Sequence, residues 1–134
     1  MIFVKKTRYL VFKSLKFRCA LGKSGIKKKI KEGDFITPKG IFSLKKVYYR
    51  EDRIKGLKTK LKKIKIKKYM AWCDDPKSKF YNRQIKLPSR YNYEKLYRKD
   101  RIYDIIITLD YNTNPIIKNK GLSLIHISEP TRPY

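Results

Sequence analysis

The alternation of apolar and polar residues predicts that this chain begins as a series of short β-strands. Every second residue from Leu15 to Leu21 is apolar, and this period of two is typical of a strand that buries one face. Two shorter stretches with β-branched and aromatic residues precede it, at Ile2–Val4 and Tyr9–Phe12. We therefore expect three strands before Gly22.

Three later stretches also have the composition of strands. Ile41–Tyr49 contains β-branched and aromatic residues, and Tyr69–Pro76 indicates a strand end followed by a turn. Ile102–Leu109 is dense in isoleucine and predicts a buried strand. The connecting segments predicted from composition are a basic loop at Lys27–Gly33 and turns at Thr37–Gly40 and Asp110–Pro115.

Helical signals are few. Asn92–Arg98 is a candidate for one short helix. Within Lys55–Lys68 the apolar residues up to Ile64 match helical spacing, whereas Ile64 and Ile66 match a strand, so the pattern leaves both structures open. The sequence contains neither an internal repeat nor a linker. The pattern predicts one mainly β domain.

Length and cysteine content agree with this prediction and narrow the class of protein. A chain of 134 residues is long enough for one modest domain. The two cysteines, Cys19 and Cys73, make neither a disulfide framework nor a zinc site, and we expect no metal and no cofactor. The apolar stretch near the N-terminus spans only three residues, so we expect no signal peptide, and no apolar run reaches transmembrane length.

The charge is strongly positive. Lysine and arginine number 36 against 11 acidic residues, a formal net charge of +25 that attracts nucleic acid, acidic lipid or another anionic polymer. The abundance of Lys, Ile, Asn and Tyr is also what an AT-rich genome encodes. The basic residues are spread along the whole chain, and no known nucleic-acid-binding module accompanies them. A solvated basic surface is the preferred interpretation, with a basic nucleic-acid-binding module as the alternative.

Two short motifs suggest chemistry that their surroundings do not support. Gly22-Lys23-Ser24 resembles the end of a phosphate-binding loop, but the position that needs the first glycine is Phe17. Asp74 and Asp75 suggest an acid pair or a metal site. Adjacent residues of an extended chain point in opposite directions, and the proline that follows favours a role in a turn.

A longer series of motifs resembles one family. The segment from Gly22 to Gly40 resembles the start of L,D-transpeptidase catalytic domains of the YkuD type, in which Lys-x-Glu-Gly-Asp-x-x-Thr-Pro-x-Gly precedes a strand. In this chain Lys29-Ile30-Lys31 leads into Glu32-Gly33-Asp34, and Thr37-Pro38-Lys39-Gly40 follows.

The resemblance continues with the order and spacing that the family shows. Its further elements are Tyr49-Arg50-Glu51-Asp52-Arg53, Trp72-Cys73-Asp74-Asp75-Pro76, Tyr81-Asn82-Arg83, Glu94-Lys95-Leu96-Tyr97-Arg98, Tyr103-Asp104 and Tyr111-Asn112. Each element alone is weak, but together they cover roughly residues 15 to 121. The resemblance implies an incomplete L,D-transpeptidase-type domain, mainly β and sandwich- or barrel-like, with one or two short helices.

We interpret the motif residues as scaffold. Glycines permit backbone angles closed to other residues, large tyrosines and the tryptophan supply apolar bodies with a polar tip, and the arginines and aspartates are able to pair when partly buried. These scaffold residues are Glu32, Gly33, Asp34, Thr37, Pro38, Gly40, Arg50, Asp52, Arg53, Trp72, Asp74, Asp75, Tyr81, Asn82, Tyr103 and Asp104.

The family's chemistry depends on a cysteine. The resemblance implies a transferase that attacks peptidoglycan stem peptides, forms a thioester and passes the acyl group to an amine, in the bacterial cell envelope or periplasm. Its cysteine follows a glycine near the end of the domain, after a strand that carries a histidine. Neither Cys19 nor Cys73 follows a glycine in that way. We therefore expect the chain as written to be inactive. A binding-only domain is a third hypothesis.

The final segment has a separate explanation. Leu122–Arg132 matches the conceptual translation of a common transposase-type sequencing adapter over eleven consecutive residues. We therefore predict that residues 1–121 are a partial transpeptidase-like domain and that residues 122–134 are an artefactual tail. His126 is the only histidine, and it lies one position closer to the preceding glycine than the histidine of the family does. On a strand, a shift of one residue turns the side chain to the opposite face of the sheet. His126 is therefore a weak catalytic candidate.

Overall fold

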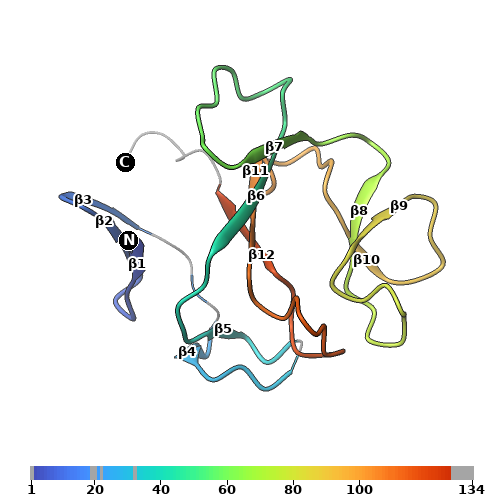
Figure 1. Cartoon of the computed structure of the whole chain (residues 1–134), viewed down its shortest axis with the longest axis horizontal. Coiled ribbons are helices and arrows are strands. Elements are labelled where there is room, and N and C mark those ends of the chain that lie inside the picture. Colours follow the sequence, from blue (N-terminus) through green and yellow to red (C-terminus); the bar gives the residue numbers. More distant parts are fainter. Residues whose placement is uncertain (1, 19–20, 22, 32, 128–134) are drawn as a thin grey trace. The chain divides into compact units, whose positions relative to one another are not determined.

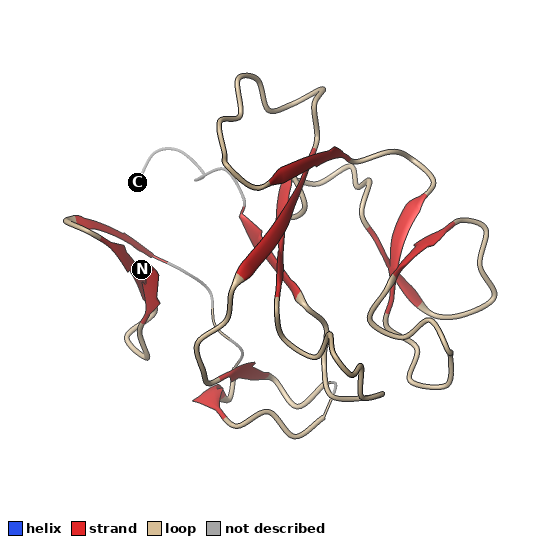
Figure 2. Cartoon of the chain, in the orientation of Figure 1, coloured by secondary structure: helices blue, strands red, loops and turns tan. Residues whose placement is uncertain are grey.

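The computed structural model describes residues 2–18, 21, 23–31 and 33–127, and these residues form strands and loops (Figures 1 and 2). The prediction of a mainly β protein is confirmed, whereas the described part of the chain contains no helix. The chain divides into two compact units, Met1–Ile41 and Phe42–Tyr134.

The first unit contains the three strands expected before Gly22. Strands β1 (Ile2–Val4), β2 (Tyr9–Phe12) and β3 (Leu15–Arg18) form an antiparallel sheet in that order. The expectation that Leu15 faces a core is wrong, because 54% of its surface is exposed. A sheet of three short strands has too little area to bury a full apolar face.

A second pair of strands in this unit changes one predicted turn. Strand β4 (Gly25–Lys27) pairs in parallel with β5 (Ile36–Pro38), so Thr37 and Pro38 belong to a strand where we predicted a turn. Pro38 is the last residue of β5, which is an edge strand of a two-stranded sheet, and a missing N–H group is tolerated on an edge strand. The next N–H group, that of Lys39, donates to the carbonyl of Lys27 at 2.9 Å and ends the pairing.

The second unit is built on a four-stranded sheet in the order β12-β11-β6-β7 (Figure 1). Its strands are β6 (Leu44–Tyr49), β7 (Lys62–Lys65), β11 (Ile105–Leu109) and β12 (Leu124–Ile127). β11 is antiparallel to both of its neighbours, and β6 and β7 are parallel. The strands predicted at Ile41–Tyr49 and Ile102–Leu109 are therefore present, each with a later first residue than the pattern indicated.

The lysine-rich stretch that the pattern left undecided contains a strand. Lys62, Lys63 and Lys65 of β7 are exposed, and Ile64 between them packs against the core. β7 has one sheet neighbour, β6. Charged side chains on such an edge strand oppose pairing with another chain.

A three-stranded antiparallel sheet completes the second unit, and it contradicts the predicted helix. Its order is β10 (Tyr93–Lys95), β8 (Met70–Cys73), β9 (Gln84–Lys86). β10 occupies the middle of Asn92–Arg98, where Glu94 pairs with Trp72 of β8. The helix prediction is wrong because so short a segment gains little from its own helical hydrogen bonds, whereas β8 offers a complete row of partners.

The core of the second unit joins both sheets. Tyr48 and Ile106 from the larger sheet pack with Met70 and Trp72 from β8 and with Leu96, which follows β10. The rings of Tyr48 and Trp72 meet edge to face at 6.2 Å, and the Tyr48 hydroxyl donates to Gln84 at 2.7 Å. Neither sheet closes on itself in the described residues. Of these residues, none belongs to a helix long and apolar enough to cross a membrane.

This core predicts a sharp contrast between two isoleucines. Ile106 has no exposed surface, so Ile106→Ala should lower the free energy of unfolding by about 2–5 kcal/mol through lost burial and a residual cavity. Ile117→Ala, at a site with 53% exposure, should change it by less than about 0.5 kcal/mol. Urea unfolding followed by the fluorescence of the single tryptophan measures both. Equal effects would show that the second unit has no packed core at Ile106.

Candidate functional site

The predicted scaffold residues of the first unit organise a turn around Asp34. Its carboxylate accepts hydrogen bonds from the Lys29 ammonium at 2.7 Å and from the backbone N–H groups of Ile30, Lys31 and Ile36. Partial burial opposes ionisation, but these bonds outweigh it and hold the pKa of Asp34 far below its usual range. Asp34 therefore stays a carboxylate at any moderate pH and acts as a structural acceptor.

The other motif residues of this segment have simpler roles. Gly33 has a positive φ of 79°, the left-handed conformation that favours glycine. Thr37 and Pro38 lie in β5, and Gly40 is exposed after it. Glu32 lies outside the described residues.

In the second unit, Arg50 forms the first of two arginine clamps. Its guanidinium is only 4% exposed and binds Asp52 through two parallel hydrogen bonds, of 2.8 and 2.7 Å. The third nitrogen donates to the carbonyl of Arg98 at 2.6 Å, and the ring of Tyr97 lies 3.6 Å from the guanidinium carbon. The hydrogen bonds and charge of Asp52 raise the pKa of Arg50, and Arg50 in turn lowers that of Asp52. Arg50 therefore anchors the segment that follows β10.

Arg53 forms the second clamp. It donates to the fully buried carboxylate of Asp104 at 2.9 Å and to the carbonyls of Lys99 and Asp100. Arg101 reaches the other oxygen of Asp104 at 3.2 Å. Two guanidinium groups thus compensate the burial of one carboxylate. Two of the expected arginine–aspartate pairs therefore form, Arg50 with Asp52 and Arg53 with Asp104.

Asn82 is a buried polar hub. Its side-chain oxygen accepts from the indole N–H of Trp72 at 3.0 Å and from the backbone N–H of Ser123 at 2.8 Å. Its amide nitrogen donates to the carbonyl of Asn112 and to the hydroxyl of Ser123, both at 2.7 Å. Asn82 also has a positive φ of 58°, a conformation that asparagine tolerates better than most residues. One side chain therefore ties β8 to the turn after β11 and to the start of β12.

Two tyrosines extend this hub. The hydroxyl of Tyr81, which is almost fully buried, accepts from the backbone N–H of Gly121 at 2.8 Å. Tyr111 donates from its hydroxyl to the carbonyl of Lys120, and its own carbonyl accepts from the Ser123 hydroxyl. Each of these tyrosines therefore uses its hydroxyl as a hydrogen-bonding tip on a large apolar ring, as we expected from the sequence.

The adjacent aspartates of the Trp72–Pro76 element do not pair with arginine in the described structure. Asp75 accepts from the backbone N–H groups of Lys77 and Asn92 and so holds a turn. Asp74 has one buried oxygen without a hydrogen-bond partner. Burial and the nearby charges of Glu94 and Asp75 raise its pKa above the usual range.

The ring of His126, on β12, lies beside the ring of Tyr103, which is in the loop before β11. His126 pairs with Ile106 in the β11–β12 ladder, and its ring meets that of Tyr103 edge to face at 5.4 Å. Loss of hydration on the covered part of the imidazole lowers the pKa of His126. Burial, and then the negative charge of Glu94, raises the pKa of Tyr103 to about 12. A neutral imidazole is able to accept a proton. It acts as a catalytic base only when a nucleophile, such as a thiol, lies within its reach.

The described residues offer no accessible thiol beside this pair. Cys73 lies on β8 with no exposed surface. Cys19 lies outside the described residues. No group of three or more His, Cys, Asp or Glu side chains suitable for a metal ion occurs in the described part of the chain.

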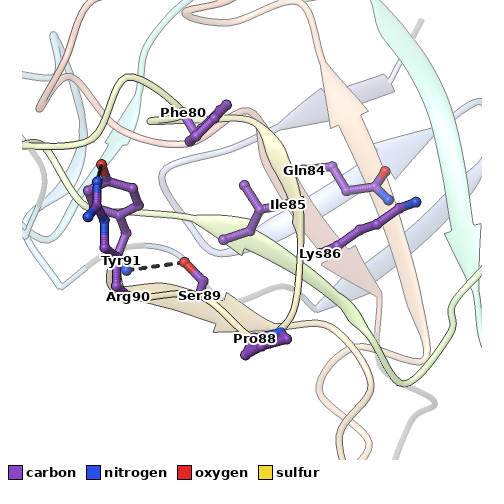
Figure 3. Close-up of a pocket in the computed structure, with 8 residues that line it drawn as sticks. All are labelled: Phe80, Gln84, Ile85, Lys86, Pro88, Ser89, Arg90 and Tyr91. Atoms are coloured by element: carbon purple, nitrogen blue, oxygen red, sulfur yellow. Dashed lines mark hydrogen bonds between the residues drawn. The ribbon is translucent and has the colours of Figure 1, made fainter.

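A shallow cleft of about 380 Å³ lies on one side of β9 (Figure 3). Ile85 extends toward Phe80 and Tyr91, whereas Gln84 and Lys86 extend from the opposite side of the strand (Figure 3). The rings of Phe80 and Tyr91 are 6.4 Å apart at an angle of 64°. The lining also includes Gln84, Lys86, Pro88, Ser89 and Arg90. The sequence gives no local signal for this cleft, because Phe80 is brought to Arg90 and Tyr91 only through the β8–β9 turn.

Comparison of this chain with models of protein families, with curated proteins and with solved structures finds no match.

The hub predicts an unusually costly asparagine substitution. Asn82→Ala should lower the free energy of unfolding by about 2–4 kcal/mol, because the Trp72 indole and the Ser123 backbone then lose buried partners. Asn119→Ala is the matched control, since Asn119 is exposed and has a similar φ of 66°. Urea unfolding compares the two variants. A similar loss in both would assign the effect to backbone conformation alone.

Burial of Tyr103 predicts a loss of stability at high pH. Its pKa rises from 10.0 in the unfolded chain to about 12 in the folded chain. The stability that this group contributes is therefore complete below pH 10 and is lost as the pH rises toward 12. Tyr103→Phe should flatten the decline of the urea midpoint over this range, whereas Tyr69→Phe, at a site with 46% exposure, should not. An unchanged slope in Tyr103→Phe would contradict the assignment.

Proposed function

We propose that residues 15–121 form the front part of an L,D-transpeptidase-type catalytic domain, a mainly β, sandwich- or barrel-like cysteine acyltransferase. The resemblance rests on motifs that are far apart in sequence. The observation that supports it best is that several of these motifs bond to one another. Arg53 binds Asp104 across 51 positions. Arg50 donates to the carbonyl of Arg98 across 48 positions, and Trp72 binds Asn82. A series of chance matches has no reason to form such buried networks.

The proposed chemistry is acyl transfer between peptidoglycan stem peptides in the bacterial cell envelope. In such a reaction a cysteine thiolate forms a thioester with the donor stem, and an amine of a second stem then takes the acyl group. The residues Arg50, Arg53, Asn82 and Asp104 act as scaffold in this proposal. No cofactor or metal is required of them.

The chain as written should not catalyse this reaction. Its one described thiol, Cys73, is buried within β8 and has no route to an acyl donor. His126 lies in the segment that we attribute to the adapter, where it pairs with Ile106 in the β11–β12 ladder. The purified chain, incubated with a stem-peptide donor and an amine acceptor, should give neither a thioester adduct nor a crosslinked product by mass spectrometry. Product formation would contradict the prediction.

The parent gene provides the positive test. Genomic sequence read across the codon for Gly121 should continue with an apolar strand that ends in histidine, and then a glycine followed by cysteine. The extended protein should crosslink stem peptides, and replacement of that cysteine by alanine should abolish the product. A continuation without the cysteine would overturn the proposed function.

A basic nucleic-acid-binding module is the second candidate. The exposed lysines Lys62 and Lys63 of β7 favour it, although Lys65 of the same strand is paired with Glu51 at 3.0 Å. Binding of a generic oligonucleotide at increasing salt, compared with retention on insoluble peptidoglycan, separates the two candidates. Under the transpeptidase proposal, retention on peptidoglycan outlasts oligonucleotide binding as the salt concentration rises.

A further inference from the structure

One face of the sheet formed by β1, β2 and β3 (Figure 1) is built from aliphatic residues. Ile2 and Leu15 both lie opposite Phe12 in the ladder, and Val4 lies opposite Leu10. Residues directly opposite each other in an antiparallel pair share a face, and so do alternate residues along one strand. The aliphatic face, as we call it, therefore comprises Ile2, Val4, Leu10 and Leu15.

The aliphatic face is largely open. Ile2 and Val4 are each 46% exposed, Leu15 is 54% exposed, and Leu10 is partly buried. A single exposed aliphatic side chain is common on a protein surface and needs no explanation. Neighbouring ones on one face of one sheet form a contiguous apolar patch, and such a patch gains free energy when a partner removes it from water.

Positive charge without a counterion adjoins the aliphatic face. Residues 1–31 contain eleven lysines and arginines and no acidic residue. Lys5 and Lys6 directly follow Val4, in the turn that joins β1 to β2, and both are exposed. No carboxylate of the described residues forms an ion pair with either lysine. This end of the sheet therefore combines a positive potential with exposed aliphatic surface.

We infer that the aliphatic face docks on the surface of an anionic lipid bilayer, with Lys5 and Lys6 at the lipid headgroups. Aliphatic side chains leave water at the boundary between headgroups and acyl chains, and lysines beside them are attracted by the negative surface. The long lysine stems lie along the apolar surface while their ammonium groups stay at the headgroups. The inference goes beyond the proposed acyl transfer, because docking uses no thiol and no residue of the scaffold networks.

The composition of the face favours lipid over two other partners. Single-stranded nucleic acid rewards cationic groups and flat aromatic rings, whereas Ile2, Val4 and Leu15 supply only aliphatic surface. A second copy of the chain covers apolar surface, but it brings together two basic segments that contain no acidic residue for pairing across the contact. An anionic bilayer is complementary both to the aliphatic surface and to the charge.

Vesicles of defined composition test the inference on the full chain. One set contains phosphatidylcholine alone, and the other contains phosphatidylcholine and phosphatidylglycerol in equal parts. Co-sedimentation at physiological ionic strength should show that the chain binds the anionic vesicles at least about tenfold more tightly, because the neutral vesicles lack the charge that attracts the lysines.

Substitutions on the aliphatic face separate its contribution from that of charge. Leu15→Ser should weaken binding to anionic vesicles about tenfold, because it removes apolar area that leaves water on docking. Ile117→Ser is the matched control, since Ile117 is 53% exposed but does not belong to the aliphatic face, and it should leave binding unchanged. Val4→Thr keeps the shape and β-branching of a strand residue and should weaken binding in the same direction as Leu15→Ser. Far-UV circular dichroism verifies that each variant keeps its strands.

A second pair of variants tests the charge. Lys5→Gln combined with Lys6→Gln should weaken binding to anionic vesicles roughly thirtyfold, the effect of two lysines near an anionic surface. Lys62→Gln combined with Lys63→Gln removes the same charge from exposed positions on β7. It should have a smaller effect, because β7 is not part of the docking sheet.

Three results would overturn the lipid assignment. The first is equal binding of the two kinds of vesicle, or a Leu15→Ser variant that binds like the unchanged chain. The second is an oligothymidylate that displaces the chain from anionic vesicles and binds Leu15→Ser equally well, which assigns the lysines to nucleic acid. The third is a dimer in sedimentation equilibrium that Leu15→Ser abolishes, which assigns the face to a second copy. Each of them leaves the acyl-transfer proposal standing, because that proposal is tested on the gene beyond Gly121.

Discussion

The amide of Asn82 holds the second unit together at a point where apolar packing alone cannot specify the arrangement. Both of its polar atoms are buried and each makes two hydrogen bonds, to Trp72 and Ser123 on one side and to Asn112 and Ser123 on the other. A buried polar group is costly unless every bond is made, so only one placement of β8, the turn after β11 and the start of β12 satisfies all of them. The packing of Trp72 against Tyr48 then follows from that placement.

The two arginine clamps, formed by Arg50 and Arg53, fix the position of the long loop after β10. Residues 97–104 contribute few apolar side chains, so their position depends on polar contacts. Arg50 and Arg53 supply these by donating to three backbone carbonyls of residues 98–100 as well as to Asp52 and Asp104. Arginine suits this role because its planar fork serves a carboxylate and a carbonyl at the same time. The loop then delivers Tyr103 beside Glu94, where burial keeps the phenol neutral.

Much of the secondary structure was predictable because its signals are local. Alternation and β-branched content located β1, β2, β3, β6 and β11, and the turn residues after Leu109 ended β11 where expected. The prediction of a helix at Asn92–Arg98 failed because the partner strand β8, and not local propensity, decides the conformation of this segment. Lys55–Lys68 stayed ambiguous for the same reason, since β6 selects a strand at Lys62–Lys65. For the candidate site, the sequence identified the residues that pair, but not which arginine meets which aspartate.

Taken alone, the sequence determined that this protein is mainly β, strongly basic and without a cysteine placed after a glycine, because composition and period-two alternation are properties of the chain itself. It also determined the motif series on which the family proposal depends. Only the tertiary structure decided that Asn82 is a hub, that Asp104 shares two arginines and that Phe80, Ile85 and Tyr91 form a cleft beside Arg90. These features depend on contacts between residues that strand pairing and turns bring together, and spacing along a chain does not encode which distant groups satisfy one another.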